Sequence, residues 1–302
     1  MTENTAFRSG FVAVAGRTNV GKSTLLNALV GQKLSIVSDK PQTTRNIIRL
    51  IRTTDTSQMV FLDAPGFHRS HNRLSEYMDE AAEGALRDVD VILFLVEEDM
   101  AIGKGDMRIL EALKDAECPV ILVINKIDRI KREEVLKKIE MYSRYDWIDD
   151  IVPISARKNI NIDTLVEVIE SHLPEGPMFF PEDMVTDKNE RFFVSEILRE
   201  KILRLLSDEI PHGVAVEIQS MEERGNIMDI EAVIYCEKKT HKAIIIGKGG
   251  EMLKRIATKA RTDMEELTGM KVALNVWVKV RDDWRDRESS LREFGYENEE
   301  DL

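Results

Sequence analysis

A glycine-rich loop near the amino terminus constrains the fold of this chain more than any other feature. Residues 16–23 read GRTNVGKS and fit the pattern G-x-x-x-x-G-K-[ST]. The loop follows the apolar run Phe11–Ala15, which predicts a buried strand, and it precedes a helix predicted over Ser23–Val30. A strand, this loop and a helix in that order are typical of a phosphate-binding loop, whereas an accidental glycine-rich turn would need neither neighbour.

The chemistry of phosphate binding accounts for the spacing within this loop. Glycine at positions 16 and 21 leaves room for backbone N–H groups to surround phosphate oxygens. We expect the Lys22 ammonium group to reach the β- and γ-phosphates and the Ser23 hydroxyl to ligate Mg²⁺. The nucleotide contacts predicted in this loop are Gly16, Arg17, Thr18, Asn19, Val20, Gly21, Lys22, Ser23 and Thr24.

A second motif selects the base. Residues 125–128 read NKID and follow Val120–Ile124, a β-branched run typical of a buried parallel strand. A carboxylate at Asp128 can accept hydrogen bonds from two N–H donors of guanine, a pair that adenine lacks. The motif therefore predicts GTP rather than ATP, with a solvated helix-capping aspartate as the alternative. The predicted contacts on the base side are Asn125, Lys126, Asp128, Ser155 and Ala156.

Two further segments predict contacts to the metal and the γ-phosphate. Asp63 follows the predicted strand Met59–Leu62 and is expected to hold Mg²⁺ through water. Thr44 lies in a polar segment and is expected to ligate Mg²⁺ when GTP is bound, with an ordinary loop threonine as the alternative. The predicted metal ligands are Ser23, Thr44 and Asp63, and the predicted catalytic residues are Lys22, Thr44, Asp63 and Gly66. The remaining nucleotide contacts are predicted at Asp63, Ala64, Pro65, Gly66 and Phe67.

The residue after Gly66 bears on the rate of hydrolysis. Many GTPases place a glutamine there to orient the attacking water, but this chain has Phe67, whose side chain cannot bind water. The sequence therefore predicts slow GTP hydrolysis by the isolated protein.

Hydrophobic patterning divides the chain at a proline-rich stretch. In the first part, strands alternate with helices, which predicts a doubly wound α/β sheet. Residues 173–181 read LPEGPMFFP, which ends a helix and makes a stiff linker. We predict a GTP-binding domain over residues 1–176, a linker over 177–189, and a second domain with an acidic tail over 190–302. The other strands and helices predicted in the first domain are Ile47–Arg52, Val91–Val96 and Ile151–Ile154, and Ser75–Arg87, Met107–Lys114, Arg132–Tyr142 and Ile162–His172.

The second domain is predicted to be a small α+β unit in the order α-β-β-α-α-β. Residues 247–250 read GKGG between two predicted helices, which matches the G-x-x-G loop of KH domains. Such a loop lets the chain approach a sugar-phosphate backbone closely, with a structural turn on a basic face as the alternative. The predicted elements are Arg191–Leu206, Ala215–Ser220, Asp229–Cys236, Thr240–Ile246, Glu251–Thr268 and Val272–Val280.

The distribution of charge supports RNA binding more than the total does. The net charge of -12 argues against a nucleic-acid partner, but residues 238–261 hold eight basic residues and one acidic residue. Screening limits the reach of distant charges to roughly 10 Å, so this local excess matters more to a bound polyanion than the net charge of the whole chain. Ile244, Ile246 and Ile256 are expected to line an apolar groove for unstacked bases. The predicted RNA contacts are Ile246, Gly247, Lys248, Gly249, Gly250, Lys254, Arg255, Lys259 and Arg261.

Composition argues against several other classes of protein. No run approaches the ~20 apolar residues that cross a bilayer, and the amino terminus lacks the pattern of a signal peptide. The chain has two cysteines, too few for a disulfide scaffold and in keeping with a reducing compartment. We expect a cytoplasmic protein and a monomer.

Together, these motifs resemble those of the Era family of bacterial GTPases over nearly the whole chain. The resemblance rests on QTTR at 42–45, DAPGFH at 63–68, NKID at 125–128, IIGKGG at 245–250 and VWVKVR at 276–281. It implies a type II KH fold, binding to the 3′ end of 16S ribosomal RNA, and a role in assembly of the 30S ribosomal subunit. Thr18 departs from the family, which has proline at this position, and we expect little effect.

The resemblance also leaves two points open. Some GTPases with a hydrophobic residue at the position of Phe67 use K⁺, held partly by an asparagine at the position of Asn19. The alternative is that Asn19 only hydrogen-bonds the switch backbone. Peripheral association with the inner face of the cell membrane, through a basic face, is the second open point.

Three functions are compatible with these sequence features. The leading hypothesis is a switch in which GTP orders the switch segments and thereby alters access to RNA. A constitutive RNA-binding module that only senses nucleotide is the second, favoured by Phe67 and opposed by the complete set of magnesium ligands. A GTPase of tRNA modification is the third, and it would need a catalytic partner domain that none of the 302 residues is expected to supply.

Overall fold

A computed structural model of the chain describes residues 6–38, 40, 43–66, 72–99, 101–207 and 210–296. The chain divides into two compact units. The first comprises residues 1–35, 44–69 and 78–187, and the second comprises residues 36–43, 70–77 and 188–302. Within the described part of the chain, no helix has the length and apolar character needed to cross a bilayer.

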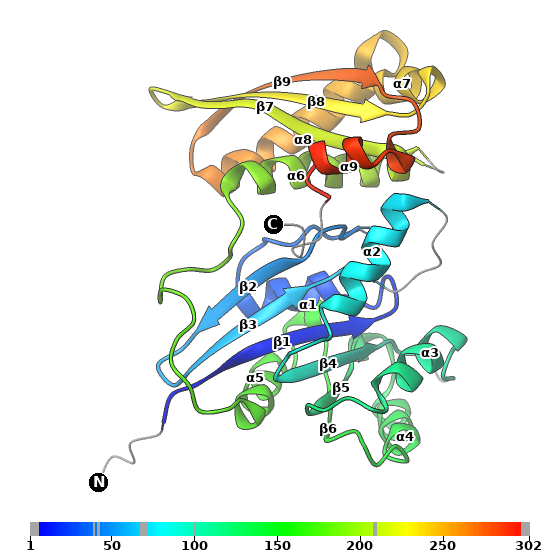
Figure 1. Ribbon diagram of the computed structural model, residues 1–302, viewed down its shortest axis with the longest axis vertical. Helices are drawn as coiled ribbons and strands as arrows, with labels where there is room; N and C mark the ends of the chain where they lie inside the picture. The colour runs from blue at the N-terminus through cyan, green and yellow to red at the C-terminus, as the bar shows by residue number, and fades with distance from the viewer. Residues whose placement is uncertain are drawn as a thin grey trace. The chain divides into compact units, whose positions relative to one another are not determined.

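The first unit is built on a six-stranded sheet in the order β2-β3-β1-β4-β5-β6. Strand β2 is antiparallel to β3, and every other neighbouring pair is parallel. Helices lie on both faces of the sheet (Figure 1). The strands are β1 Arg8–Gly16, β2 Ile48–Thr53, β3 Ser57–Asp63, β4 Val91–Val96, β5 Val120–Ile124 and β6 Asp150–Pro153. The helices are α1 Lys22–Val30, α2 Arg73–Gly84, α3 Lys104–Leu113, α4 Arg132–Tyr142 and α5 Ile162–His172.

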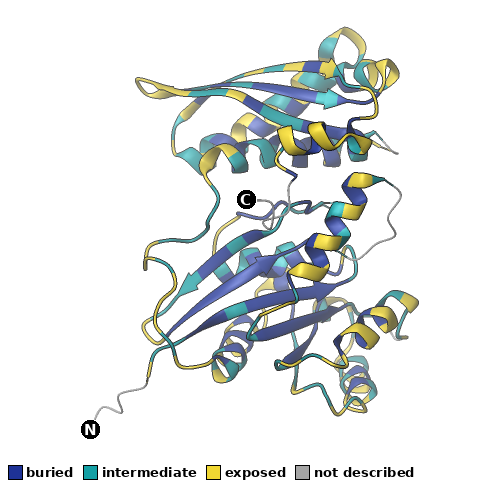
Figure 2. Ribbon diagram, viewed as in Figure 1, coloured by how far each residue is buried: buried dark blue, intermediate teal, exposed yellow. Residues whose placement is uncertain are grey.

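The central strands are buried on both faces, as the continuous apolar runs predicted (dark blue in Figure 2). One core joins β1, β4 and β5 to α3 and α4, with Phe94 and Tyr142 among its largest members. The predicted bounds of β4, β5, α4 and α5 are confirmed to the residue. Helix α3 begins at Lys104, three residues before the predicted Met107. Apolar periodicity did not reveal this first turn, because its residues are polar. The doubly wound fold is thus confirmed.

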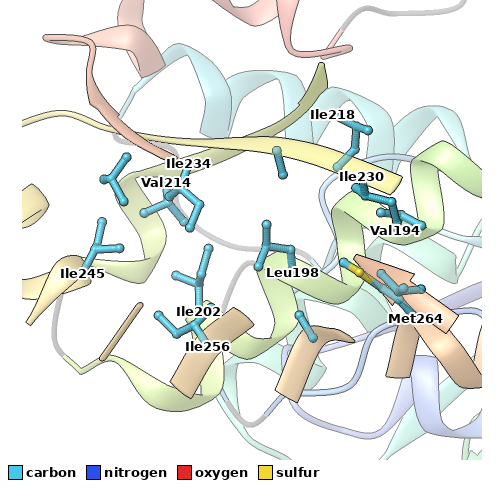
Figure 3. Packing of buried hydrophobic residues seen from close by; sticks show 14 of the residues in the cluster. Val194, Leu198, Ile202, Val214, Ile218, Ile230, Ile234, Ile245, Ile256 and Met264 are labelled. Carbon is cyan, nitrogen blue, oxygen red and sulfur yellow. The ribbon is translucent and has the colours of Figure 1, made fainter. Parts of the chain in front are cut away.

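The second unit is an α+β fold around a three-stranded sheet in the order β7-β8-β9. Strands β7 and β8 are antiparallel, and β8 and β9 are parallel. Apolar side chains of α6 and α8 meet the inner face of this sheet in one core (Figure 3). The elements are α6 Glu190–Leu205, β7 Val214–Arg224, β8 Ile227–Cys236, α7 Lys239–Ile246, α8 Glu251–Thr268, β9 Lys271–Val280 and α9 Glu288–Glu293. The predicted α-β-β-α-α-β order is confirmed.

Two features of the second unit were not predicted. Strand β7 continues four residues past the predicted end at Ser220, through a charged stretch whose backbone pairs with β8. Helix α9 has only six residues, with no apolar periodicity to reveal it. It lies near the fully buried Trp284, whose indole N–H donates to the Gly213 carbonyl at 2.9 Å. The end of β7 and the presence of α9 therefore depend on tertiary contacts and not on the local sequence pattern.

The stretch after α5, residues 174–187, belongs to the first unit and follows its surface. The Ser9 amide donates to the Pro174 carbonyl at 3.1 Å, and the Ile51 amide donates to the Val185 carbonyl at 2.9 Å. The Gln58 side chain donates to the Phe180 carbonyl at 2.9 Å. This stretch thus covers edge strand β2, whose free backbone groups would otherwise face solvent.

Candidate functional site

The phosphate loop joins β1 to α1 at the carboxyl edge of the parallel sheet. Gly21 adopts a left-handed conformation with φ +102°, and a Cβ there would lie 2.4 Å from the side-chain amide nitrogen (Nδ2) of Asn125. A Cβ on Gly16 would lie 2.9 Å from the Leu95 carbonyl oxygen. Both glycines are therefore required by contacts from distant segments, and the predicted loop conformation is present.

Lys22 lies inside this loop. Its Nζ donates to the carbonyls of Gly16 at 3.0 Å and Arg17 at 3.2 Å, and only 8% of the residue is exposed. A Cβ on Gly66 would lie 2.9 Å from the same Nζ. The segment after β3 therefore approaches Lys22 closely, as a γ-phosphate site requires.

GTP binding is expected to weaken as the pH rises above about 8. Burial lowers the pKa of Lys22 to about 8, and the Asp63 carboxylate raises it in part. Phosphate oxygens beside Nζ would raise this pKa, so above pH 8 binding takes up a proton that Lys22 has already lost. Below the lowered pKa, Lys22 is protonated before binding, and this contribution no longer changes with pH.

Titration calorimetry in buffers of different ionisation enthalpy measures this proton uptake. We expect uptake at about pH 9 and almost none at about pH 6.5. Binding heats that do not depend on the buffer at the higher pH would contradict the assignment of Lys22 to the phosphates.

Three oxygen-bearing side chains converge beside the loop. The Ser23 hydroxyl lies 3.2 Å from the Thr44 hydroxyl and 3.4 Å from Asp63 Oδ2. Thr44 is 9% exposed and Asp63 is 1% exposed. Two ligands at right angles on Mg²⁺, with bonds of about 2.1 Å, lie about 3 Å apart, so the Ser23 and Thr44 hydroxyls fit the ion, and Asp63 lies close enough to hold it through water. Within the described ranges, no group of three or more His, Cys, Asp or Glu side chains is placed to hold a metal.

Asn125 ties three segments of the site together. Its amide nitrogen donates to the Val20 carbonyl at 2.9 Å. Its amide oxygen accepts from the backbone N–H groups of Lys126 at 2.8 Å and Ala156 at 3.1 Å. Asn125 is 2% exposed. This buried side chain therefore holds the phosphate loop, the NKID segment and the loop at Ala156 together.

The Asp128 carboxylate is held by a hydrogen bond from the next loop of the site. The Ser155 hydroxyl donates to its Oδ1 at 2.6 Å, and this hydrogen bond lowers the pKa of Asp128. The carboxylate is therefore ionised at neutral pH and keeps an oxygen for an N–H donor. Ser155 is fully buried, which fixes the partner.

Some predicted contacts take other roles. The side chain of Arg17 turns away from the phosphate side, since its Nε donates to Asp106 at 2.8 Å. If Arg17 contacts the nucleotide, we therefore expect its backbone and not its side chain to do so. Asp106 escaped sequence analysis because it belongs to no motif, and the only signal was an acidic residue in the first turn of α3. Gln42, Phe67 and His68 lie outside the described residues.

The second candidate site is the GKGG loop between α7 and α8. A Cβ on Gly247 would lie 2.7 Å from the Met252 Cβ, so glycine is required there. Gly249 and Gly250 have φ of +60° and +83°, with open space around both. The side chains of Lys248, Lys254, Arg255, Lys259 and Arg261 are exposed on this loop and on α8.

Of the isoleucines predicted to line an apolar groove, only two lie at the surface. Ile244 is 49% exposed and Ile246 is half-buried beside the loop. Ile256 is fully buried in the core against the sheet, so its assignment to the groove is wrong. It lies on the inner face of α8, because helical spacing places it with Ala260 and Met264.

Comparison with known proteins agrees with this geometry. The family described as "50S ribosome-binding GTPase" matches residues 11–126, and the family described as "KH domain" matches residues 209–285. The chain is 54% identical to GTPase Era of Clostridium botulinum (strain Alaska E43 / Type E3), covering 96% of this chain and 99% of the relative. It is 51% identical to GTPase Era of Alkaliphilus metalliredigens (strain QYMF), covering 97% and 100%.

Two solved structures are also similar, each at 40% identity with a TM-score of 0.93, covering 97% of this chain and 100% of the other. One is Era in complex with MgGDPNP and nucleotides 1506–1542 of 16S ribosomal RNA. The other is a variant of Aquifex aeolicus Era bound to GDP·AlF4⁻.

Proposed function

The chain belongs to the Era family of GTPases, and from this premise we propose that it is a slow GTP-hydrolysing switch for small-subunit ribosomal RNA. It binds the 3′ end of 16S ribosomal RNA and acts in assembly of the 30S subunit, as a cytoplasmic monomer. The observation that carries the GTPase assignment is the convergence of Ser23, Thr44 and Asp63 beside the buried Lys22.

The proposed mechanism relies on positioning and charge. Backbone N–H groups of the phosphate loop and the Lys22 ammonium bind the phosphates, while Asp128 selects guanine. Ser23, Thr44 and Asp63 would hold Mg²⁺, which neutralises charge on the phosphate oxygens. Gly66 offers its backbone N–H to the γ-phosphate. Because Phe67 cannot orient water, the intrinsic rate is slow.

Chain connectivity supports a switch. Thr44, the proposed metal ligand, directly follows residues 36–43, which belong to the second unit. A movement of Thr44 with nucleotide state would therefore be passed along the chain to a segment that belongs to the other unit. We propose that GTP binding resides in residues 1–176 and RNA binding in residues 190–302, through the GKGG loop and its basic neighbours.

Turnover in the presence of RNA tests the proposed coupling. We expect purified protein to hydrolyse GTP severalfold faster with a short RNA copied from the 3′ end of 16S ribosomal RNA. A scrambled RNA of the same length is the control. Measurable turnover that neither RNA changes, with RNA affinity independent of nucleotide, would instead support the constitutive RNA-binding module.

A monovalent cation offers a second test of the site. Asn19 has φ +68° in the phosphate loop, and its carbonyl accepts a hydrogen bond from Lys126 at 2.9 Å. We propose that Asn19 helps to hold K⁺, which places positive charge where other GTPases insert an arginine. Turnover should then be faster in KCl than in NaCl at equal ionic strength. Equal rates in the two salts would contradict the K⁺ site and favour the alternative, in which Asn19 only hydrogen-bonds the switch backbone.

A further inference from the structure

An acidic segment after β4 holds basic residues from both halves of the nucleotide site. Glu97 pairs with Lys126 of the NKID motif at 2.9 Å. Asp99 and Asp106 pair with Arg17 of the phosphate loop at 3.3 Å and 2.8 Å. None of these acidic residues belongs to a nucleotide-binding motif. The two loops that enclose phosphates and base are thus fastened to one short stretch of chain.

Arg17 transmits this attachment to the phosphate side. Its backbone carbonyl accepts a hydrogen bond from Lys22, while its side chain reaches Asp106. A Cβ on Gly105 would lie 2.6 Å from Arg17 Cδ, so the arginine stem rests on the start of α3. Asp106 is only 3% exposed, so loss of Arg17 would leave a buried polar group without this hydrogen bond.

On the base side, Lys126 links the acidic segment to the phosphate loop. Its Nζ donates both to Glu97 and to the Asn19 carbonyl of the phosphate loop, each at 2.9 Å. The two side chains of this pair are 21% and 20% exposed, so solvent screens them less than a surface pair. Glu97 therefore fixes the direction of an ammonium group that bridges the base motif and the phosphate loop.

We infer that Glu97 and Asp106 are positioning residues for nucleotide binding, which act through Lys126 and Arg17 to hold the two loops of the site in one arrangement. This inference rests on the proposed GTP-binding function. Neither carboxylate belongs to a nucleotide-binding motif, and each is paired with a basic residue of such a motif. Their loss should therefore loosen the site and speed nucleotide release, with little change in the rate of hydrolysis at saturating GTP.

The test measures dissociation of a fluorescent GDP analogue from the full-length protein. Asp106→Asn is expected to speed release about tenfold, and Glu97→Gln about fivefold, because each removes one charged partner from a loop. Glu98→Gln is the matched control. Glu98 pairs with Arg129, whose side chain is 51% exposed, so release should change less than about twofold.

A double-mutant cycle separates positioning from general stability. If Asp106 acts through Arg17, the variant carrying both Arg17→Gln and Asp106→Asn releases GDP no faster than the faster single variant. A purely structural role would lower the thermal midpoint of each variant but leave release from the folded protein unchanged, which would overturn the inference. Glu97 is partly exposed, so Glu97→Gln still decides the matter if Asp106→Asn does not fold. Failure of the unmodified protein to bind GDP would overturn the proposed function as well.

Discussion

Replacing Asp128 by asparagine is expected to lower the affinity for GTP by about 10⁴-fold and to raise the affinity for xanthosine triphosphate. The structure holds this carboxylate by the Ser155 hydroxyl and lowers its pKa, so it is an ionised acceptor at neutral pH. An asparagine would present an N–H group to the N–H donors of guanine and leave them unpaired. Xanthine has a carbonyl in place of the guanine amino group and can accept from that N–H.

Competition binding with both nucleotides measures this change. Asp146→Asn makes the same chemical substitution at an exposed position and serves as the control. Unchanged GTP affinity in Asp128→Asn would contradict the assignment of the guanine pocket. A parallel loss of affinity for both nucleotides would instead indicate that the variant is damaged.

The second large effect is expected in the GKGG loop. A variant with Lys248→Asp and Gly249→Asp should bind single-stranded RNA about 100-fold more weakly, because it places two negative charges against phosphates. The fold should tolerate it. Gly249 has φ +60° with open space around it, and aspartate adopts this conformation more readily than most residues. GTP binding should be retained.

RNA affinity measured across a range of salt concentrations tests this prediction. The salt dependence should fall by about one unit of slope for each phosphate contact that is lost. Lys137→Asp reverses a charge on the exposed side of α4, in the first unit, and is the matched control. If RNA and GTP binding fell together in the GKGG variant, the proposed division of functions between the two parts of the chain would be wrong.

The sequence alone determined the parts of the site that depend on local chain geometry. The phosphate loop has glycines at fixed spacing between a buried strand and a helix, and the sequence pattern that reveals it lies within residues 11–30. The same holds for the GKGG loop and for β4 and β5, whose continuous apolar runs suit only a strand buried on both faces. Local pattern and observed structure agree wherever backbone conformation is set by near neighbours.

Only the tertiary structure decided which side chains meet. Arg17 is a predicted contact of the phosphate loop, but no motif indicates that its charge pairs with Asp106, 89 residues away along the chain. Asn125 joins the phosphate loop to Ala156 through its side-chain amide, and Ile256 packs in the core of the second unit. Periodicity and motifs report the backbone and the buried face of each element. The partner of a charged or polar side chain is set by long-range packing, which no local window of sequence contains.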